Sequence, residues 1–143
     1  AKCMKTFSVL DYAGYHYFKR VNSSITHRFT KDYFALSYRR IESMFRYCES
    51  MAYLEPEVYN ILGNRLLRYT FSALSRNHNP LSEMSRADMI KWVKENTSRE
   101  MYKVILPACT FSNPAHKVLN LLIRFKCNAL IVGLGKLVYL LMK

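Results

Sequence analysis

From residue 30 onward, apolar side chains recur at alternating steps of four and three residues, which predicts an amphipathic helix. Thr30 is the expected N-cap, and Asp32 suits the positive end of the helix dipole. Arg39, Arg40 and Arg46 fall on the opposite face and are expected to be solvated. The residues that form the apolar stripe are Phe34, Tyr38, Ile41, Phe45, Cys48 and Ala52.

A second apolar stripe with the same spacing follows Glu55-Pro56, and Pro is tolerated in a first helical turn. Further on, Ser85 and Asp88, three residues apart, form a pattern close to a capping box, which predicts the start of a short helix. Trp92 lies in this helix and is expected to anchor it to the core. The second stripe consists of Val58, Leu62, Leu66, Tyr69 and Ala73.

The remainder of the chain also has helix signals. A brief helix is expected over residues 98–106, ended by Pro107. Asn113 before Pro114 combines an N-cap with Pro at the first helical position, and the helix that it begins can run to the C-terminus.

Residues 6–18 differ from everything after them, because β-branched and aromatic residues predominate there and predict short extended pieces. The fold class predicted is therefore mainly α: a helical bundle of about four to five helices with a short β-like, extended N-terminal arm. The expected division is an arm over residues 1–29 and a helical domain over residues 30–143.

The chain of 143 residues carries a net charge of +12, which favours anionic partners, although a merely solvated basic surface stays open. The four cysteines are far apart and contain no closely spaced pair, so a structural zinc site is not expected. Cys48 and Cys127 fall in apolar helical patterns and are expected to be reduced, buried thiols, which favours a cytoplasmic location. No signal-peptide pattern is present.

The C-terminal part is both the most apolar and the most one-sided in charge, because no acidic residue follows Glu100. Its charge-free stretches are shorter than the about 20 apolar residues that a spanning helix needs. A cationic, apolar helix without carboxylates fits the interface of an anionic leaflet, here on the inner face of the cell membrane. Burial in the bundle is the alternative that stays open. The membrane-contact candidates are Lys117, Arg124, Lys126 and Lys136.

Residues 14–29, "GYHYFKRVNSSITHRF", followed by a long amphipathic helix, resemble the region just after the catalytic core of family-2 glycosyltransferases of bacterial polysaccharide synthesis. Members of that family often carry two Tyr, an Arg and a Ser-Ile-Thr sequence in this region. The resemblance covers this stretch alone. In this chain the pattern falls on Tyr15, Tyr17, Arg20, Ser24, Ile25 and Thr26.

The resemblance implies a parent enzyme with a GT-A type domain that uses a nucleotide-diphosphate sugar and a divalent metal, Mg²⁺ or Mn²⁺. Such domains bind the metal through an Asp-x-Asp motif and use a separate carboxylate as base. Asp11 and Asp32 stand alone here, so neither feature is present. We therefore assign no catalytic residue and no cofactor to this chain, expect no turnover from it in isolation, and expect its partner to be a missing N-terminal catalytic domain. The start at Ala1 rather than Met agrees with this expectation.

The resemblance also implies which side chains would complete a donor site. His16 is the metal candidate, since imidazole is a competent divalent-metal ligand, and Arg20 can pair with diphosphate oxygens. Tyr15 and Tyr17 are the candidates for stacking on a sugar. An outward-facing His16, an ion-paired Arg20 and a simple helix-initiating turn at residues 22–24 stay open. The donor and phosphate-binding candidates are His16, Arg20, Ser23, Ser24 and Thr26.

The leading hypothesis is the C-terminal helical part of a glycosyltransferase of cell-surface polysaccharide synthesis, which supports the donor site and seats the enzyme at the membrane. A basic nucleic-acid-binding module is the alternative, not favoured because the basic residues are spread over every helix without a recognisable motif. A helical interaction domain, dimeric through its last helix, is a third. His27, His78 and His116 are expected to be solvated.

Overall fold

The computed structural model describes residues 32–141, so the expected N-terminal arm lies outside the described residues. Within the described part the chain forms six α-helices and no strand, which confirms the mainly α prediction. The count exceeds the expected one because the last predicted helix is two helices. The elements are α1 (Tyr33–Ser50), α2 (Pro56–Asn77), α3 (Arg86–Thr97), α4 (Glu100–Ile105), α5 (Pro114–Arg124) and α6 (Asn128–Leu141), with two 3-10 turns, η1 (Pro80–Ser82) and η2 (Leu106–Ala108).

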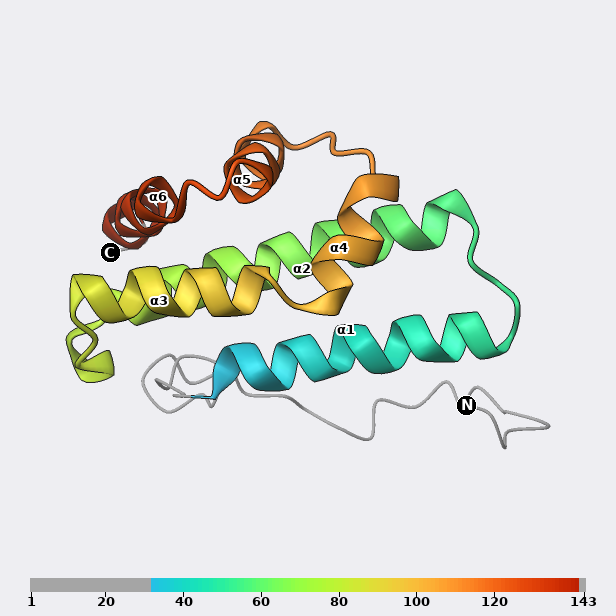
Figure 1. The fold of residues 1–143 in the computed structure, drawn as a ribbon, viewed down its shortest axis with the longest axis horizontal. Coiled ribbons are helices and arrows are strands. Elements are labelled where there is room, and N and C mark those ends of the chain that lie inside the picture. Colours follow the sequence, from blue (N-terminus) through green and yellow to red (C-terminus); the bar gives the residue numbers. More distant parts are fainter. Residues whose placement is uncertain (1–31, 142–143) are drawn as a thin grey trace, which may run out of the picture.

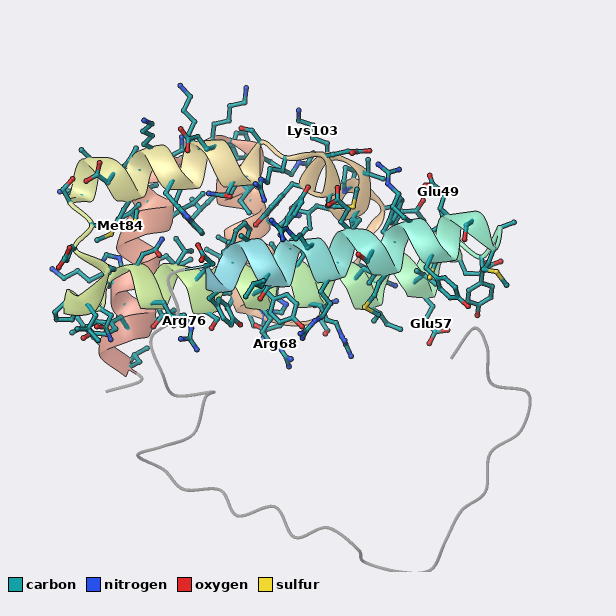
Figure 2. The ribbon with its side chains drawn as sticks, turned by 90° about the horizontal axis from the view of Figure 1, so that it is seen from below. Glu49, Glu57, Arg68, Arg76, Met84 and Lys103 are labelled. Carbon is teal, nitrogen blue, oxygen red and sulfur yellow. The ribbon has the colours of Figure 1, made fainter. Side chains whose placement is uncertain are left out.

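The helices stack in three layers, with α1 on one side, α2, α3 and α4 in the middle, and α5 and α6 on the other side (Figure 1). The axes of α5 and α6 run across those of α2 and α3, as the turned view also shows (Figure 2). Helix α2 packs against both α1 and α6, and α6 also packs against α3. The pair α5–α6 therefore forms an outer layer, which we call the α5–α6 layer.

Helix α1 confirms most of the first predicted stripe, since Phe34, Tyr38, Ile41 and Phe45 are all buried. The helix begins at Tyr33 with Asp32 at the N-cap position, so the expected start at Thr30 was early; Thr30 itself lies outside the described residues.

The prediction that the first stripe continues to Ala52 within the helix was wrong. Helix α1 ends at Ser50, and Ala52 lies outside it with a left-handed φ of 52°. The Ala52 N–H donates to the Glu49 carbonyl and the Tyr53 N–H to the Cys48 carbonyl, at 3.0 and 2.9 Å. These two bonds form a Schellman motif, which turns the chain toward α2.

Helix α2 begins at Pro56 as predicted and is the centre of the fold. Leu62, Leu66 and Ala73 of the predicted stripe are buried, while Val58 and Tyr69 pack against the core with part of their surface exposed. Helix α6 covers a second side of α2, which the single predicted stripe did not include. Outside the predicted stripe, α2 also buries Gly63, Leu67, Thr70 and Leu74. Leu74 packs against Gly135 of α6, whereas Gly63 lies against Ile105 and Cys109, and Thr70 bonds to Tyr102 of α4.

Helix α3 begins at the predicted capping box. Asp88 N–H donates to Ser85 Oγ, and Ser85 N–H donates to the Asp88 carboxylate, both at 3.2 Å. The Ser85 hydroxyl also donates to the Asp88 carboxylate at 2.5 Å, and this bond, followed by that from the Ser85 N–H, lowers the pKa of Asp88. The Trp92 side chain is half-buried and meets the Phe34 ring edge-on at 5.0 Å between centroids, so it links α3 to α1.

Helix α4 lies inside the span predicted for it and contacts both α1 and α2. The Met101 N–H donates to the Tyr38 hydroxyl at 3.2 Å, and the buried Tyr102 hydroxyl lies 2.6 Å from Thr70 Oγ1. Thr70 Oγ1 donates to the Leu66 carbonyl, so the Tyr102 hydroxyl donates to Thr70. Burial raises the pKa of Tyr102.

The last predicted helix is confirmed at its start and wrong in its length. The Asn113 side chain accepts from the Ala115 N–H at 2.9 Å, as expected of an N-cap. Helix α5 ends at Arg124, and Lys126 takes a left-handed φ of 53°. Its N–H donates to the Ile123 carbonyl and that of Cys127 to the Leu122 carbonyl, a second Schellman motif. The turn lets α6 fold back and pack on α2 and α3.

Candidate functional site

The donor-site residues inferred from the family resemblance lie outside the described residues. They include His16, the metal candidate, and Arg20, the diphosphate candidate. Among residues 32–141 no group of three or more His, Cys, Asp or Glu side chains is placed to hold a metal ion. The unplaced residues are Tyr15, His16, Tyr17, Arg20, Ser23, Ser24 and Thr26.

The α5–α6 layer exposes apolar side chains on the face that points away from the middle layer. Leu119 of α5 and Ile131 of α6 are fully buried, which fixes the inward sides of the two helices. On the other sides Phe125 is 70% exposed and Leu141 78% exposed. We call this surface the outer face, and its apolar residues are Val118, Leu121, Phe125, Leu130, Leu137, Leu140 and Leu141.

Helical spacing explains why these side chains share a face. In α5, Val118, Leu121 and Phe125 follow one another at steps of three and four, so they lie in one row. In α6, Leu130 and Leu137 are two turns apart and lie above one another. Isolated exposed leucines are normal on protein surfaces, but a set shared by two neighbouring helices marks an interaction surface.

The four predicted membrane-contact residues all lie in the α5–α6 layer, and all are exposed. Lys117 and Arg124 fall in the same helical row as Leu121, Lys126 lies in the turn between the helices, and Lys136 lies on α6. Within residues 32–141 none of their side chains makes an ion pair or a hydrogen bond. No carboxylate is present in this layer, because Glu100 is the last acidic residue.

The ion pairs in the described part of the chain are both formed by Arg46, on the other side of the molecule. Its guanidinium donates to Glu49 at 3.0 Å and to Glu100 at 2.6 Å, and these carboxylates raise its pKa. Arg46 is exposed as predicted but is paired. The cations of the α5–α6 layer therefore differ from Arg46 in having no carboxylate partner among residues 32–141.

Helices α5 and α6 are buried on one side and exposed on the other, so the predicted burial in the bundle applies to one side, and interfacial membrane contact stays a prediction for the other. Ile131, Val132 and Gly135 are buried against the middle layer, while the outer face is exposed. Along residues 32–141, no helix combines the length and the apolar character needed to cross a bilayer.

The histidines of the described part are structural, and the expectation that His78 and His116 are solvated was wrong. His78 Nε2 donates to the Val132 carbonyl at 2.9 Å and so ties α2 to α6. His116 Nδ1 lies 2.8 Å from Asn64 Oδ1, and its ring stacks on Phe71. Burial, followed by the charge of Arg68, lowers the pKa of His116. His27 lies outside the described residues.

The described part of the chain contains three cysteines, and none of them forms a disulfide there. Cys48, Cys109 and Cys127 are free and half-buried, so Cys48 and Cys127 are less buried than expected. Burial raises the pKa of the Cys109 thiol, which keeps it protonated and a poor nucleophile.

Comparisons with protein-family models, with curated proteins and with solved structures gave no significant match for this chain. The resemblance of residues 14–29 to family-2 glycosyltransferases therefore stays a prediction. Within the described part, the α5–α6 layer combines exposed apolar side chains with cations that form no ion pair there.

Proposed function

We propose that the helical domain seats the chain on an anionic membrane surface, with the outer face of α5 and α6 against the lipid. The observation that carries this proposal is the combination of an exposed apolar surface with unpaired Lys and Arg side chains and no carboxylate in the same layer. A peripheral location on the inner face of the cell membrane follows from it as part of the proposal.

Two contributions to the binding free energy support the proposal. Apolar surface removed from water contributes about 25 cal/mol per Å², and the outer face offers several leucines and a phenylalanine for burial at the headgroup boundary. Each Lys or Arg near an anionic leaflet adds about 1 kcal/mol. Lys117, Arg124, Lys126 and Lys136 can extend their charged ends toward lipid phosphates while their aliphatic parts cover apolar surface.

We further propose that the chain is the C-terminal helical part of a glycosyltransferase that acts in cell-surface polysaccharide synthesis. The support is the sequence pattern around Tyr15, Arg20 and Thr26, together with the proposed membrane seating, since a lipid-linked acceptor requires an enzyme at the membrane. The parent enzyme would bind a nucleotide-diphosphate sugar and Mg²⁺ or Mn²⁺. In the full-length enzyme, His16→Ala and Arg20→Ala are expected to lower turnover or donor affinity; unchanged kinetics in both would remove these residues from the donor site.

A direct test can also detect two other partners of the outer face: nucleic acid and a second copy of the chain. Nucleic acid is disfavoured because phosphate backbones are bound by basic surfaces, whereas this face is predominantly apolar. A second copy of the chain would bury the same leucines, and the state of association in solution would reveal it.

The test is co-sedimentation of the whole chain with vesicles of phosphatidylcholine alone or mixed with phosphatidylglycerol. We expect binding to the mixed vesicles only, and its loss in the Leu137→Glu/Leu140→Glu variant. The matched control, Leu36→Glu/Leu81→Glu, changes two similarly exposed leucines outside the α5–α6 layer and should bind as the unmodified chain does.

Equal, negligible binding to both vesicles would contradict the membrane proposal. Strongly salt-dependent binding to DNA or RNA without vesicle binding would favour the nucleic-acid alternative. A stable dimer that the Leu137→Glu/Leu140→Glu variant dissociates would assign the outer face to a second copy instead.

A further inference from the structure

A cleft of about 530 Å³ lies between the α5–α6 layer and α4. None of the exposed leucines of the outer face lines it, although it shares Arg124 and Lys126 with the proposed lipid contacts. Its volume is in the range typical of small-molecule sites. Three cations line it: Lys103, which extends outward from α4 (Figure 2), Arg124 at the end of α5, and Lys126 in the following turn. Segments that are distant in sequence therefore gather positive charge at one place.

Within the part of the chain that the structure describes, no carboxylate compensates the charge of the cleft. No Asp or Glu is among its lining residues, and within residues 32–141 the side chains of Lys103, Arg124 and Lys126 form no ion pair. An anion that enters the cleft would meet these cations without a competing carboxylate among the lining residues. The cleft is therefore complementary to a ligand with negative charge.

The polar groups that line the cleft can accept hydrogen bonds from a ligand. Asn120 lines it, and the Asn120 Oδ1 atom is buried with no partner in the described part of the chain. Thr97 Oγ1 donates to the Val93 carbonyl and Ser98 Oγ to the Lys94 carbonyl, so both oxygens retain acceptor capacity only. A buried acceptor without a donor costs stability, so a hydroxyl-bearing ligand would satisfy Asn120.

We propose that this cleft binds an organic phosphate that carries free hydroxyl groups, of the polyol-phosphate or sugar-phosphate class. The planar guanidinium of Arg124 can bond two phosphate oxygens at once, and Lys103 and Lys126 act as point charges beside it. Asn120 Oδ1 accepts from a hydroxyl of the ligand. Leu106, Pro107 and Ile123 supply the apolar wall along its carbon skeleton. The site shares Arg124 and Lys126 with the proposed lipid contacts, and the binding of a hydroxyl-bearing phosphate goes beyond membrane seating.

The test uses glycerol 3-phosphate, inorganic phosphate and glycerol as probes, titrated calorimetrically into the whole chain. Glycerol 3-phosphate is expected to bind more tightly than inorganic phosphate, and glycerol not at all. Since a charge-assisted hydrogen bond contributes about 1.5–3 kcal/mol, Lys103→Gln/Arg124→Gln should weaken glycerol 3-phosphate binding by about tenfold or more. Arg65→Gln/Lys91→Gln is the matched control, since it removes the same charges from exposed positions outside the cleft.

A second variant tests the hydroxyl contact separately from the charge. Asn120→Leu is similar in size and removes the acceptor, so it should abolish the preference for glycerol 3-phosphate over inorganic phosphate and leave binding of the latter intact. The proposal is overturned if none of the phosphates binds the folded chain, or if the control variant loses as much affinity as Lys103→Gln/Arg124→Gln.

The source of the phosphate is distinguished with vesicles that contain phosphatidylglycerol, whose headgroup carries the same chemistry. If saturating glycerol 3-phosphate lowers vesicle binding while glycerol does not, the cleft takes the lipid headgroup. If vesicle binding is unaffected while the soluble titration succeeds, the ligand is a free phosphate. Because the titration needs no membrane, failure of the seating proposal would leave its result intact.

Discussion

At the scale of single residues, His116 shows how a polar side chain joins two layers. Asn64 Nδ2 donates to the Asn60 carbonyl at 2.8 Å, which leaves Asn64 Oδ1 as the acceptor for the Nδ1–H of His116. The ring lies between Phe71, stacked at 6.0 Å, and Phe111, edge-on at 6.4 Å. The site thus holds a neutral imidazole between α2 and α5.

The lowered pKa of His116 predicts that folding stability falls as the pH is lowered below the ordinary value of 6.5. There the unfolded chain binds a proton that the folded chain resists, so the contribution of His116 is full above 6.5 and is lost as the pH falls through the folded pKa. Urea denaturation above and below pH 6.5 measures this. The His116→Gln variant should lose part of the pH dependence, and an unchanged slope in that variant would contradict the assignment.

At the scale of elements, α6 contains two glycines in opposite environments. A Cβ added at Gly135 would lie 2.8 Å from Leu74 Cβ and 3.4 Å from His78 Nε2, so the absence of a side chain lets α6 approach α2 closely. At Gly133 a Cβ would meet nothing within 4 Å, because that position is exposed. Only Gly135 is therefore required by the packing.

Replacing each of the two glycines by alanine should change the stability of the chain in opposite directions. Gly133→Ala should stabilise the chain by about 1 kcal/mol through helix propensity. Gly135→Ala should destabilise it by about 1–3 kcal/mol, because overpacking forces α6 away from α2. Thermal or urea unfolding of the two variants tests this, and equal effects would mean that α6 does not contact α2 at Gly135.

The turns after α1 and α5 predict a further pair of stabilising substitutions. Ala52 and Lys126 hold the left-handed position of a Schellman motif, which in L-residues costs about 1–2 kcal/mol. Ala52→Gly and Lys126→Gly should each raise the free energy of unfolding, by about 1 kcal/mol at most once the greater freedom of glycine in the unfolded chain is counted. A loss of stability in both variants would show that these helices do not end there.

At the scale of the whole molecule, features that depend on neighbouring residues could be predicted from the sequence, whereas features that depend on distant residues could not. The starts at Pro56, Ser85 and Asn113 depend on neighbouring residues and were predicted. The ends at Ala52 and Lys126 were missed, since neither position is the glycine that usually marks such a turn.

The same limit applies to the candidate sites. The composition alone shows that the C-terminal segment is apolar and has no acidic residue. Which side of it is exposed depends on how it packs against α2 and α3. The partners of His78 and His116 lie 54 and 52 residues away in sequence. The cleft joins residues from Thr97 to Lys126 across several elements without any periodic pattern.

The central claim, that the outer face of α5 and α6 meets lipid, is tested most directly by the depth of single residues in the membrane. Trp92 is the only tryptophan of the chain, so a Trp92→Phe background allows one new tryptophan at a time. With vesicles that contain brominated phosphatidylglycerol, fluorescence of the Leu137→Trp variant should be quenched and that of Leu81→Trp should not. Equal quenching of the two, or quenching of neither, would contradict the account.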